Sequence, residues 1–196
     1  VAATRLENTT LTGNYAISGG GGLFNEADNG TATATLVYAT LGINTATSGG
    51  GGIHVTNSDG RSVIALSATI ISNGLGAGPD CAAPGGSILS NGYNLDGDGT
   101  CKLNQTGDQP HANAGLLPQT INPPGDTATH ALAAGSAALN RIPAGSTGCG
   151  VGFATDQRGA PRPYPAGEFC DVGAFERQTE PEATKFMIYL PIGMDR

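Results

Sequence analysis

Apolar residues in this chain occur in short runs separated by clusters of Gly, Asn, Ser and Asp. Two such runs are Thr35-Leu36-Val37-Tyr38 and Val63-Ile64-Ala65-Leu66. The runs are rich in Thr, Val and Ile, which favour strands, and they lack the three-and-four spacing of an amphipathic helix. The pattern therefore predicts many short β-strands joined by turns, that is, an all-β fold.

These runs belong to an internal repeat. When residues 6–24 are placed over residues 36–54, 10 of the 19 positions are identical, and a block of four glycines falls on a second block of four. A third, weaker copy keeps the same offset through Leu66, Thr69 and Ile71. Self-similarity at a period of roughly 20–50 residues is the signature of a repeat architecture.

A unit of this length suits one coil of a right-handed parallel β-helix, in which successive coils pair ~4.8 Å apart. We expect about three coils. Two inward ladders are predicted, one formed by Leu6, Leu36 and Leu66 and the other by Leu11, Leu41 and Ile71. The glycine blocks, Gly19–Gly22 and Gly49–Gly52, are expected at a corner with positive φ, because a flexible linker would not recur in phase.

Composition narrows the function classes. The chain has 196 residues, of which 32 are Gly and only 13% are charged, with a net charge of −7. A binder of nucleic acid needs a basic stripe, and this acidic chain has none, so no nucleic-acid partner is expected. We also expect no membrane span, because no apolar run approaches the length that a spanning helix needs.

The four cysteines are widely spaced, and no two of them have the CxxC spacing of a zinc or redox site. Their even number favours two disulfides and an oxidising compartment, with four buried free thiols as the alternative. We predict the pairs Cys81–Cys101 and Cys149–Cys170. Each closes a loop of about twenty residues around a Gly/Pro-rich stretch, and such closure contributes about 3 kcal/mol in the chain-entropy model.

Several phrases of the sequence resemble known secreted proteins. Gly21-Gly22-Leu23-Phe24-Asn25 and Gly51-Gly52-Ile53-His54 look like the repeats of polymorphic outer-membrane and adhesin-type β-helices. Asp156-Gln157-Arg158-Gly159, Arg162-Pro163 and Cys170-Asp171-Val172-Gly173-Ala174-Phe175-Glu176, in that order, resemble the choice-of-anchor Q domain of secreted bacterial β-helix proteins. The resemblance implies an exported bacterial protein of the cell surface or extracellular space, and no established catalytic activity.

Three segments follow from these observations. Residues 1–105 are expected to form the parallel β-helix coils. Residues 106–177 are expected to form an irregular, disulfide-tied cap over the C-terminal end of the coils, whose backbone edge would otherwise be unpaired. Residues 178–196 are a polar linker and an apolar tail, and the alternating tail is a candidate assembly strand formed by Phe186, Ile188, Tyr189, Leu190 and Ile192.

Candidate metal-binding and catalytic residues are few. Asp96 and Asp98 resemble the start of a calcium loop, yet no closing Glu follows, and a turn before Cys101 is the alternative. No other cofactor is expected. His130 is expected to be a hydrogen-bonded structural residue. The acids of the repeat, such as Asp28 and Asp59, do not align on one row as a β-helix lyase or hydrolase would require.

The densest group of charges lies near the end of residues 106–177. Arginine forks can pair carboxylates and so tie together a segment that lacks strand hydrogen bonds, and we expect this structural role rather than an active site. The group consists of Asp156, Arg158, Arg162, Asp171 and Glu176.

The hypothesis that follows is a non-enzymatic, extracellular structural or adhesin-like protein, the C-terminal part of a β-helix surface or filament-forming element. The alternatives are a carbohydrate-active β-helix enzyme (polysaccharide lyase or hydrolase) and a module that binds cell-surface glycans. The first coil begins without a polar cap, so its open edge is expected to receive upstream coils, a second subunit or the apolar tail of a neighbour. Among these we expect self-association.

Overall fold

The computed structural model describes residues 1–73 and 78–178 of the chain, and these residues form an all-β structure, as the sequence predicts. The single helical element among them is a 3₁₀ turn, η1 (Ser146–Gly148). The parallel body contains the strands β1 (Ala2–Thr12), β2 (Tyr15–Ala16), β3 (Leu23–Ala27), β4 (Thr31–Gly42), β5 (Thr45–Ala46), β6 (Ile53–Asn57), β7 (Arg61–Ser67), β8 (Ile70–Ser72), β9 (Cys81–Ala82), β10 (Ser87–Ser90), β11 (Leu95–Asp96) and β12 (Gln109–Pro110). The remaining segment contains β13 (Thr120–Ile121), β14 (Ala128–Thr129), β15 (Ile142–Pro143) and β16 (Phe169–Cys170).

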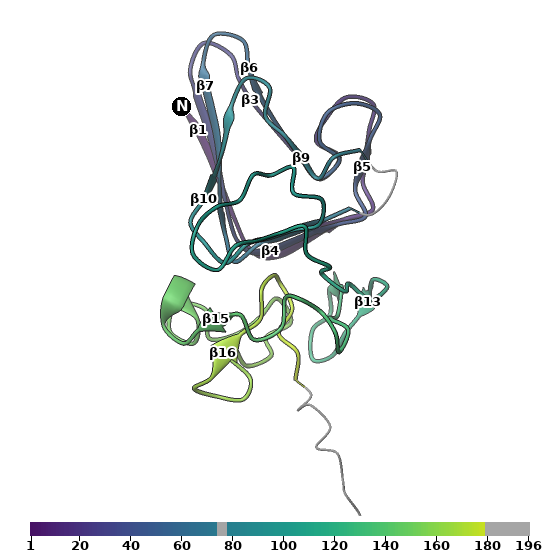
Figure 1. Ribbon diagram of the computed structural model, residues 1–196, viewed down its shortest axis with the longest axis vertical. Coiled ribbons are helices and arrows are strands. Elements are labelled where there is room, and N and C mark those ends of the chain that lie inside the picture. The colour runs from purple at the N-terminus through teal and green to yellow at the C-terminus, as the bar shows by residue number, and fades with distance from the viewer. Residues whose placement is uncertain (74–77, 179–196) are drawn as a thin grey trace, which may run out of the picture.

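Strands of successive repeat copies pair in parallel at the offset of the sequence repeat. In the largest sheet β1 pairs with β4 and β4 with β7, so that Leu6 lies opposite Leu36 and Leu36 opposite Leu66. Two smaller parallel sheets follow the same rule, β3-β6-β9 and β2-β5. Viewed as in Figure 1, the overlying strands outline a curled body with a side formed by β3, β6 and β9 and a side formed by β4.

Positive φ angles at aligned residues bend the long strands. Asn8, Tyr38 and Ala68 hold equivalent positions in three copies and have φ angles of 44°, 51° and 50°. The bend divides β1 and β4 into two arms that run along different sides of the body (Figure 1). This corner carries no glycine, so it was not visible in the sequence pattern.

The glycine blocks occupy another corner, where two physical demands select them. Gly20 and Gly49 have the expected positive φ, 76° and 69°. Elsewhere in the blocks the demand is close packing of one copy on the next. A Cβ on Gly21 would lie 2.3 Å from the carbonyl oxygen of Thr45, and one on Gly52 would lie 2.5 Å from Nδ2 of Asn73.

The interior of the parallel body is an apolar core built from the predicted ladders. Leu36, Leu41, Leu66 and Ile71 are fully buried. Their partners in the first copy, among them Leu6, are only half-buried, because β1 is the edge of its sheet and pairs with β4 alone among the described residues. The column therefore has one open apolar end.

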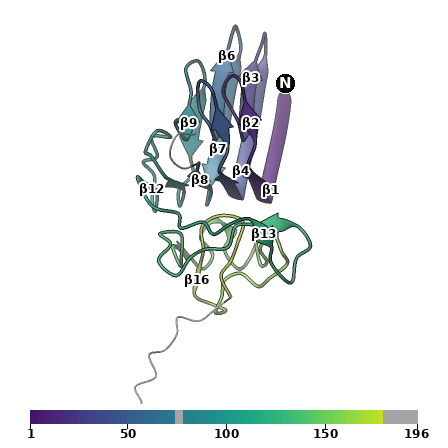
Figure 2. The ribbon, with the colours of Figure 1, turned by 90° about the vertical axis from the view of Figure 1, so that its right-hand side faces the viewer.

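Residues 106–177 lie along one side of the parallel body, and the expectation that they cover its C-terminal end is wrong. In Figures 1 and 2 this segment, green to yellow, lies beneath the strands. Its hydrogen bonds reach the first copy, where the Asn8 side chain donates to the Thr155 carbonyl and Thr10 donates to Gln157. A second apolar core fills this contact, with Tyr38 fully buried in it.

The C-terminal end of the interior is closed by a much shorter segment that follows β11. Cys101 and Leu103 are buried in the interior core, so residues 97–103 cover the last copy. Because this segment belongs to residues 1–105, end closure and side cover are performed by different parts of the chain. The apolar tail, residues 186–192, lies outside the described residues. Within the described part of the chain, no helix has the length and apolarity to cross a membrane.

Candidate functional site

Two disulfides join the pairs that the sequence predicts, Cys81–Cys101 and Cys149–Cys170. Disulfides of this kind are typical of proteins that fold in an oxidising compartment outside the cytosol. The first ties β9 to the segment that closes the interior. The second ties η1 and the turn after it to β16, inside the side cover.

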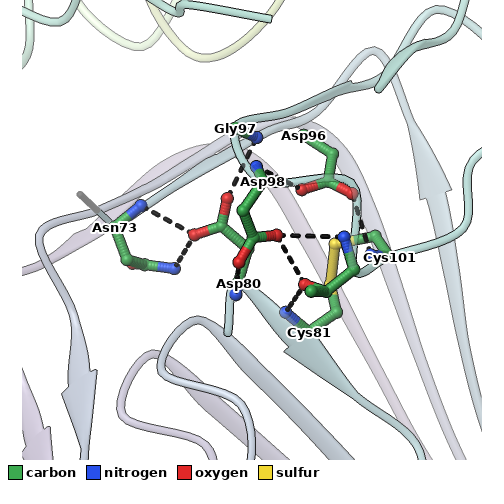
Figure 3. Close-up of a disulfide and its surroundings, with 8 residues drawn as sticks. Asn73, Asp80, Cys81, Asp96, Gly97, Asp98 and Cys101 are labelled. Carbon is green, nitrogen blue, oxygen red and sulfur yellow. Dashed lines mark hydrogen bonds between the residues drawn. A yellow bond between two sulfur atoms is a disulfide. The ribbon is translucent and has the colours of Figure 1, made fainter. Parts of the chain in front are cut away.

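Three aspartates gather beside the first disulfide, and they are the densest acidic cluster of the described residues. One carboxylate oxygen from each of Asp80, Asp96 and Asp98 lies within 4.8 Å of the others. Figure 3 shows the three side chains converging next to the Cys81–Cys101 bond. Asp96 and Asp98 were candidate metal ligands from the sequence, whereas Asp80 was not, because its only signal there was its place beside a cysteine.

All six carboxylate oxygens of this cluster accept hydrogen bonds. Asp80 accepts the main-chain N–H of Asn73 on Oδ1 and that of Gly97 on Oδ2. Asp96 accepts the main-chain N–H groups of Asp98 and Cys101. The oxygens of Asp98 accept from main-chain N–H groups of Thr100 and Asp80. A cation entering the cluster would have to compete with these bonds for every ligand oxygen.

Burial separates the acidities of the three carboxyls. Burial, together with the charge of Asp80, raises the pKa of Asp96 to about 7 despite the hydrogen bond from Cys101. Burial also raises the pKa of Asp80. Asp98 is more exposed: desolvation acts to raise its pKa, but hydrogen bonds from Thr100 and from the main chain of Asp80 outweigh it and lower the pKa.

A pocket of about 340 Å³ opens beside the cluster. Its wall contains Asp80, Asp98 and His111, together with Ser72 and Asn113. The groups that could act on a ligand here are carboxylates and an imidazole, which fit a cation or a proton-transfer step. The hydrogen bonds already made by both aspartates instead favour a structural use of this corner.

The cluster is the end of a ladder of side chains that runs through the copies. Asn14 donates its main-chain N–H to Oδ1 of Asn44, Asn44 donates in the same way to Asn73, and Asn73 to Asp80. Asp80 then donates its N–H to Asp98. Asparagine side chains thus accept the main-chain N–H that connects each copy to the next, and aspartates take this role at the C-terminal end of the ladder.

The charged group predicted in the side cover is also brought together. Arg158 donates from Nε and Nη2 to one oxygen of Asp156, at 2.9 and 2.7 Å, and lies over the Phe175 ring. Arg162 donates to the carbonyls of Asp171 and Gly173. These forks supply the hydrogen bonds that irregular backbone cannot supply for itself.

Arg162 links the side cover to the parallel body. Its guanidinium lies 4.1 Å from the centre of the Tyr38 ring, and its Nε is 3.6 Å from the Glu176 carboxylate. Burial, with the charge of Asp171, raises the pKa of Glu176 to about 8 despite Arg162, and burial raises the pKa of Asp171 as well. The group therefore holds carboxyls that ionise less readily than ordinary ones.

The remaining candidates lie apart from the acidic cluster. His130 is buried and hydrogen-bonded, as expected: Nδ1–H donates to the Leu117 carbonyl and Nε2 contacts the Thr12 hydroxyl. Asp28 and Asp59 are both exposed, and Asp28 accepts a hydrogen bond from Ser58.

Comparison with protein-family models, with curated proteins and with solved structures gives no match. The functional conclusion therefore depends on the geometry of the described residues.

Proposed function

We propose that the chain is a non-enzymatic structural element of an extracellular or cell-surface protein, built as a right-handed parallel β-helix of about three coils. The observation that carries the proposal is the parallel pairing of β1, β4 and β7 at the same offset as the sequence repeat. Stacked coils make a rigid column whose sides can be extended or covered. The resemblance to choice-of-anchor Q domains supports the same role.

The positions of the carboxylates support a structural role over a catalytic one. A β-helix lyase or hydrolase needs acids or bases free to reach a substrate on one face. The carboxylates of Asp80, Asp96 and Asp98 accept hydrogen bonds from main-chain N–H groups. The side chains of Asp171 and Glu176 are buried and also accept main-chain N–H groups.

The test is an activity panel on the full chain with acidic and neutral polysaccharides, with and without calcium. We expect no turnover above that of heat-unfolded protein. Turnover that is lost on Asp80→Asn or Asp98→Asn, in protein that remains folded by circular dichroism, would contradict the structural role.

A second candidate, glycan binding, is favoured by one observation. Phe24 on β3 is 45% exposed, and its ring is parallel to that of His54 on β6, at a centroid distance of 5.5 Å. Flat aromatic faces are suited to stacking against a sugar ring. Binding on a glycan array that is lost in Phe24→Ala but kept in Val151→Ala, another exposed apolar position far along the chain, would establish it.

A further inference from the structure

The two ends of the parallel body differ in how their hydrogen-bonding groups are used. At one end β1 has a partner strand on one side only among the described residues. At the other end the chain folds back over the interior and is locked by Cys81–Cys101. This difference indicates which end of the parallel body can pair with a further strand. The inference drawn from it rests on the structural role proposed above.

The Asn ladder has a direction. Each rung donates its main-chain N–H toward the next copy, while the side-chain Nδ2 of Asn44 reaches back to the Leu11 carbonyl of the copy before. Asn94 reaches back in the same way, to the Leu66 carbonyl. A complete rung thus uses one neighbour on each side.

Aspartates close the ladder at the C-terminal end. A carboxylate accepts but cannot donate, so Asp80 and Asp98 lack the side-chain N–H that Asn14 and Asn73 direct to the following rung. The main-chain N–H of Asp98 turns to Asp96 in the same loop. A second, shorter series of the same kind runs from Thr69 to Asn94 to Asp108, each residue donating its main-chain N–H to the side chain of the next. It also ends at an aspartate, because Asp108 donates its own N–H to the nearby Gln105 carbonyl.

The first rung, by contrast, is built like an internal one. Asn14 is an amide rather than an acid, and its Nδ2 donates forward to Asn44, the acceptor that its main-chain N–H already uses. Of the two internal rungs, Asn73 directs this group forward in the same way, to Asp80, and Asn44 directs it backward to the Leu11 carbonyl. Asn14 therefore has the chemistry to serve a copy on its other side.

Apolar side chains also concentrate on the first copy. Tyr15 and Ile17 are 68% and 79% exposed, and Tyr15 lies opposite Thr45 of the second copy. The interior leucines show the same contrast, because Leu11 is half-buried whereas its partner Leu41 is fully buried. Apolar side chains that are exposed on the first copy, where the second copy has a polar residue, indicate that another part of a protein packs against the first copy.

We propose that the body is a one-sided end piece: the outer edge of β1 receives one further parallel copy of the repeat, covalently joined ahead of Val1, and the opposite end, closed by Asp80, Asp98 and Asp108, receives none. The outer edge of β1 continues the parallel pairing that joins β1 to β4, so a further copy of the repeat is the partner that fits this edge. The C-terminal end of a second molecule does not fit this edge, because Cys101 and Leu103 already cover the interior core there.

The experiment joins a duplicate of residues 31–60 directly ahead of Val1 in the full chain. The control carries the same segment in scrambled order. We expect the native-order extension, and not the scrambled one, to raise the midpoint of thermal unfolding. It should also slow amide exchange at alternate residues of β1 at least tenfold, with the extended protein monomeric by light scattering.

Three results would overturn the inference. One is an extension that remains protease-sensitive while β1 exchanges as in the parent chain. Another is concentration-dependent polymers of the extended protein, because they require the C-terminal end to accept a copy. A third is a dimer that persists unchanged after extension. None of these results implies catalysis, so each leaves the structural role standing, whereas turnover in the polysaccharide panel would refute that role alone.

Discussion

Single residues decide how the copies are held together at their corners. Asn44 and Asn73 each accept a main-chain N–H from the previous copy, and Asp80 and Asp98 continue the series with carboxylates. Because the donors at Asn44, Asn73 and Asp80 belong to buried residues, each of them needs its acceptor to avoid a desolvation cost. Asp96 and Asp98, which resemble the start of a calcium loop in the sequence, are thus explained by the main-chain N–H groups whose hydrogen bonds they accept.

Removing the last acceptor should destabilise the closed end. Asp98→Ala leaves the main-chain N–H of buried Asp80 without its acceptor and removes two further bonds from Thr100. We expect the free energy of unfolding to fall by about 1–3 kcal/mol. Denaturant titration measures it, with exposed Asp59→Ala as the matched control that changes stability by less than about 0.5 kcal/mol. Equal effects of the two substitutions would contradict the assignment.

The same carboxylates set the expected response to calcium. Every oxygen of Asp80, Asp96 and Asp98 already accepts a hydrogen bond, so binding must first break bonds that hold the loop. We expect millimolar calcium, compared with a chelator, to leave the midpoint of thermal unfolding unchanged. A rise of several degrees that disappears in Asp98→Ala would show instead that the cluster is a calcium site.

At the scale of elements, the glycine blocks let one copy approach the next. A Cβ at Gly52 would contact Asn73, Asp80 and Ile71 at 2.5–2.8 Å, whereas the nearest atom to a Cβ at Gly30 is 3.8 Å away. The two glycines are therefore constrained differently. Close approach of the next copy requires glycine at position 52, whereas neither a close contact nor a positive φ requires it at position 30.

This contrast gives a paired test. Gly52→Ala should lower the free energy of unfolding by about 1–3 kcal/mol, the usual cost of overpacking. Gly30→Ala should be neutral or slightly stabilising, because alanine restricts the unfolded chain. Chemical denaturation of both variants measures the difference, and a tolerated Gly52→Ala would mean that the copies are not in close contact there.

Arg162 is one of the residues that connect the side cover to the strands. Arg162 is buried, donates to two carbonyls and lies over the Tyr38 ring. Arg162→Met should cost about 1–3 kcal/mol for each of the two carbonyls, those of Asp171 and Gly173, that it leaves without this donor. The exposed Arg5→Met, which loses only a surface pair with Glu7, should cost less than about 1 kcal/mol. Comparable losses would contradict this ranking.

The repeat made the strands, their register and the interior ladders predictable from the sequence, because a fixed offset determines which leucines meet. The position of residues 106–177 was predicted wrongly, over the end of the strands instead of along their side. The strand β4 shows this cover, because its residues 36–42 are all buried, without the alternation of a strand that has one face in solvent. The bend at Tyr38 was missed because no glycine marks it, and Asp80 was missed because its partners are distant in sequence.

For the molecule as a whole, buried carboxyls predict how stability changes with pH. The pKa of Glu176 is raised to about 8 and that of Asp96 to about 7, so the folded state holds protons that the unfolded state releases above its ordinary value near 4.5. Stability is then highest at the acidic side of this window and falls as pH rises through it. The lowered pKa of Asp98 acts in the opposite sense, but only below its ordinary value of 3.8.

We therefore expect the free energy of unfolding to decrease between pH 5 and pH 8, on the order of 1 kcal/mol per pH unit for each extra proton held. Denaturant titrations at constant ionic strength measure the slope. Glu176→Gln should flatten it, even if that variant is less stable throughout. Stability that rises over this range would contradict the raised pKa values.

Native-state hydrogen exchange of the full chain can distinguish a parallel repeat with one closed and one open end from a repeat whose two ends are alike. We predict slow exchange for the main-chain N–H groups of Asn73, Gly97 and Cys101, which donate to the aspartates, comparable with the interior strands. In β1 we predict alternate slow and fast amides, because every second N–H faces away from β4. Uniformly fast exchange over residues 97–101, or uniform protection of β1 in a monomer, would contradict the account.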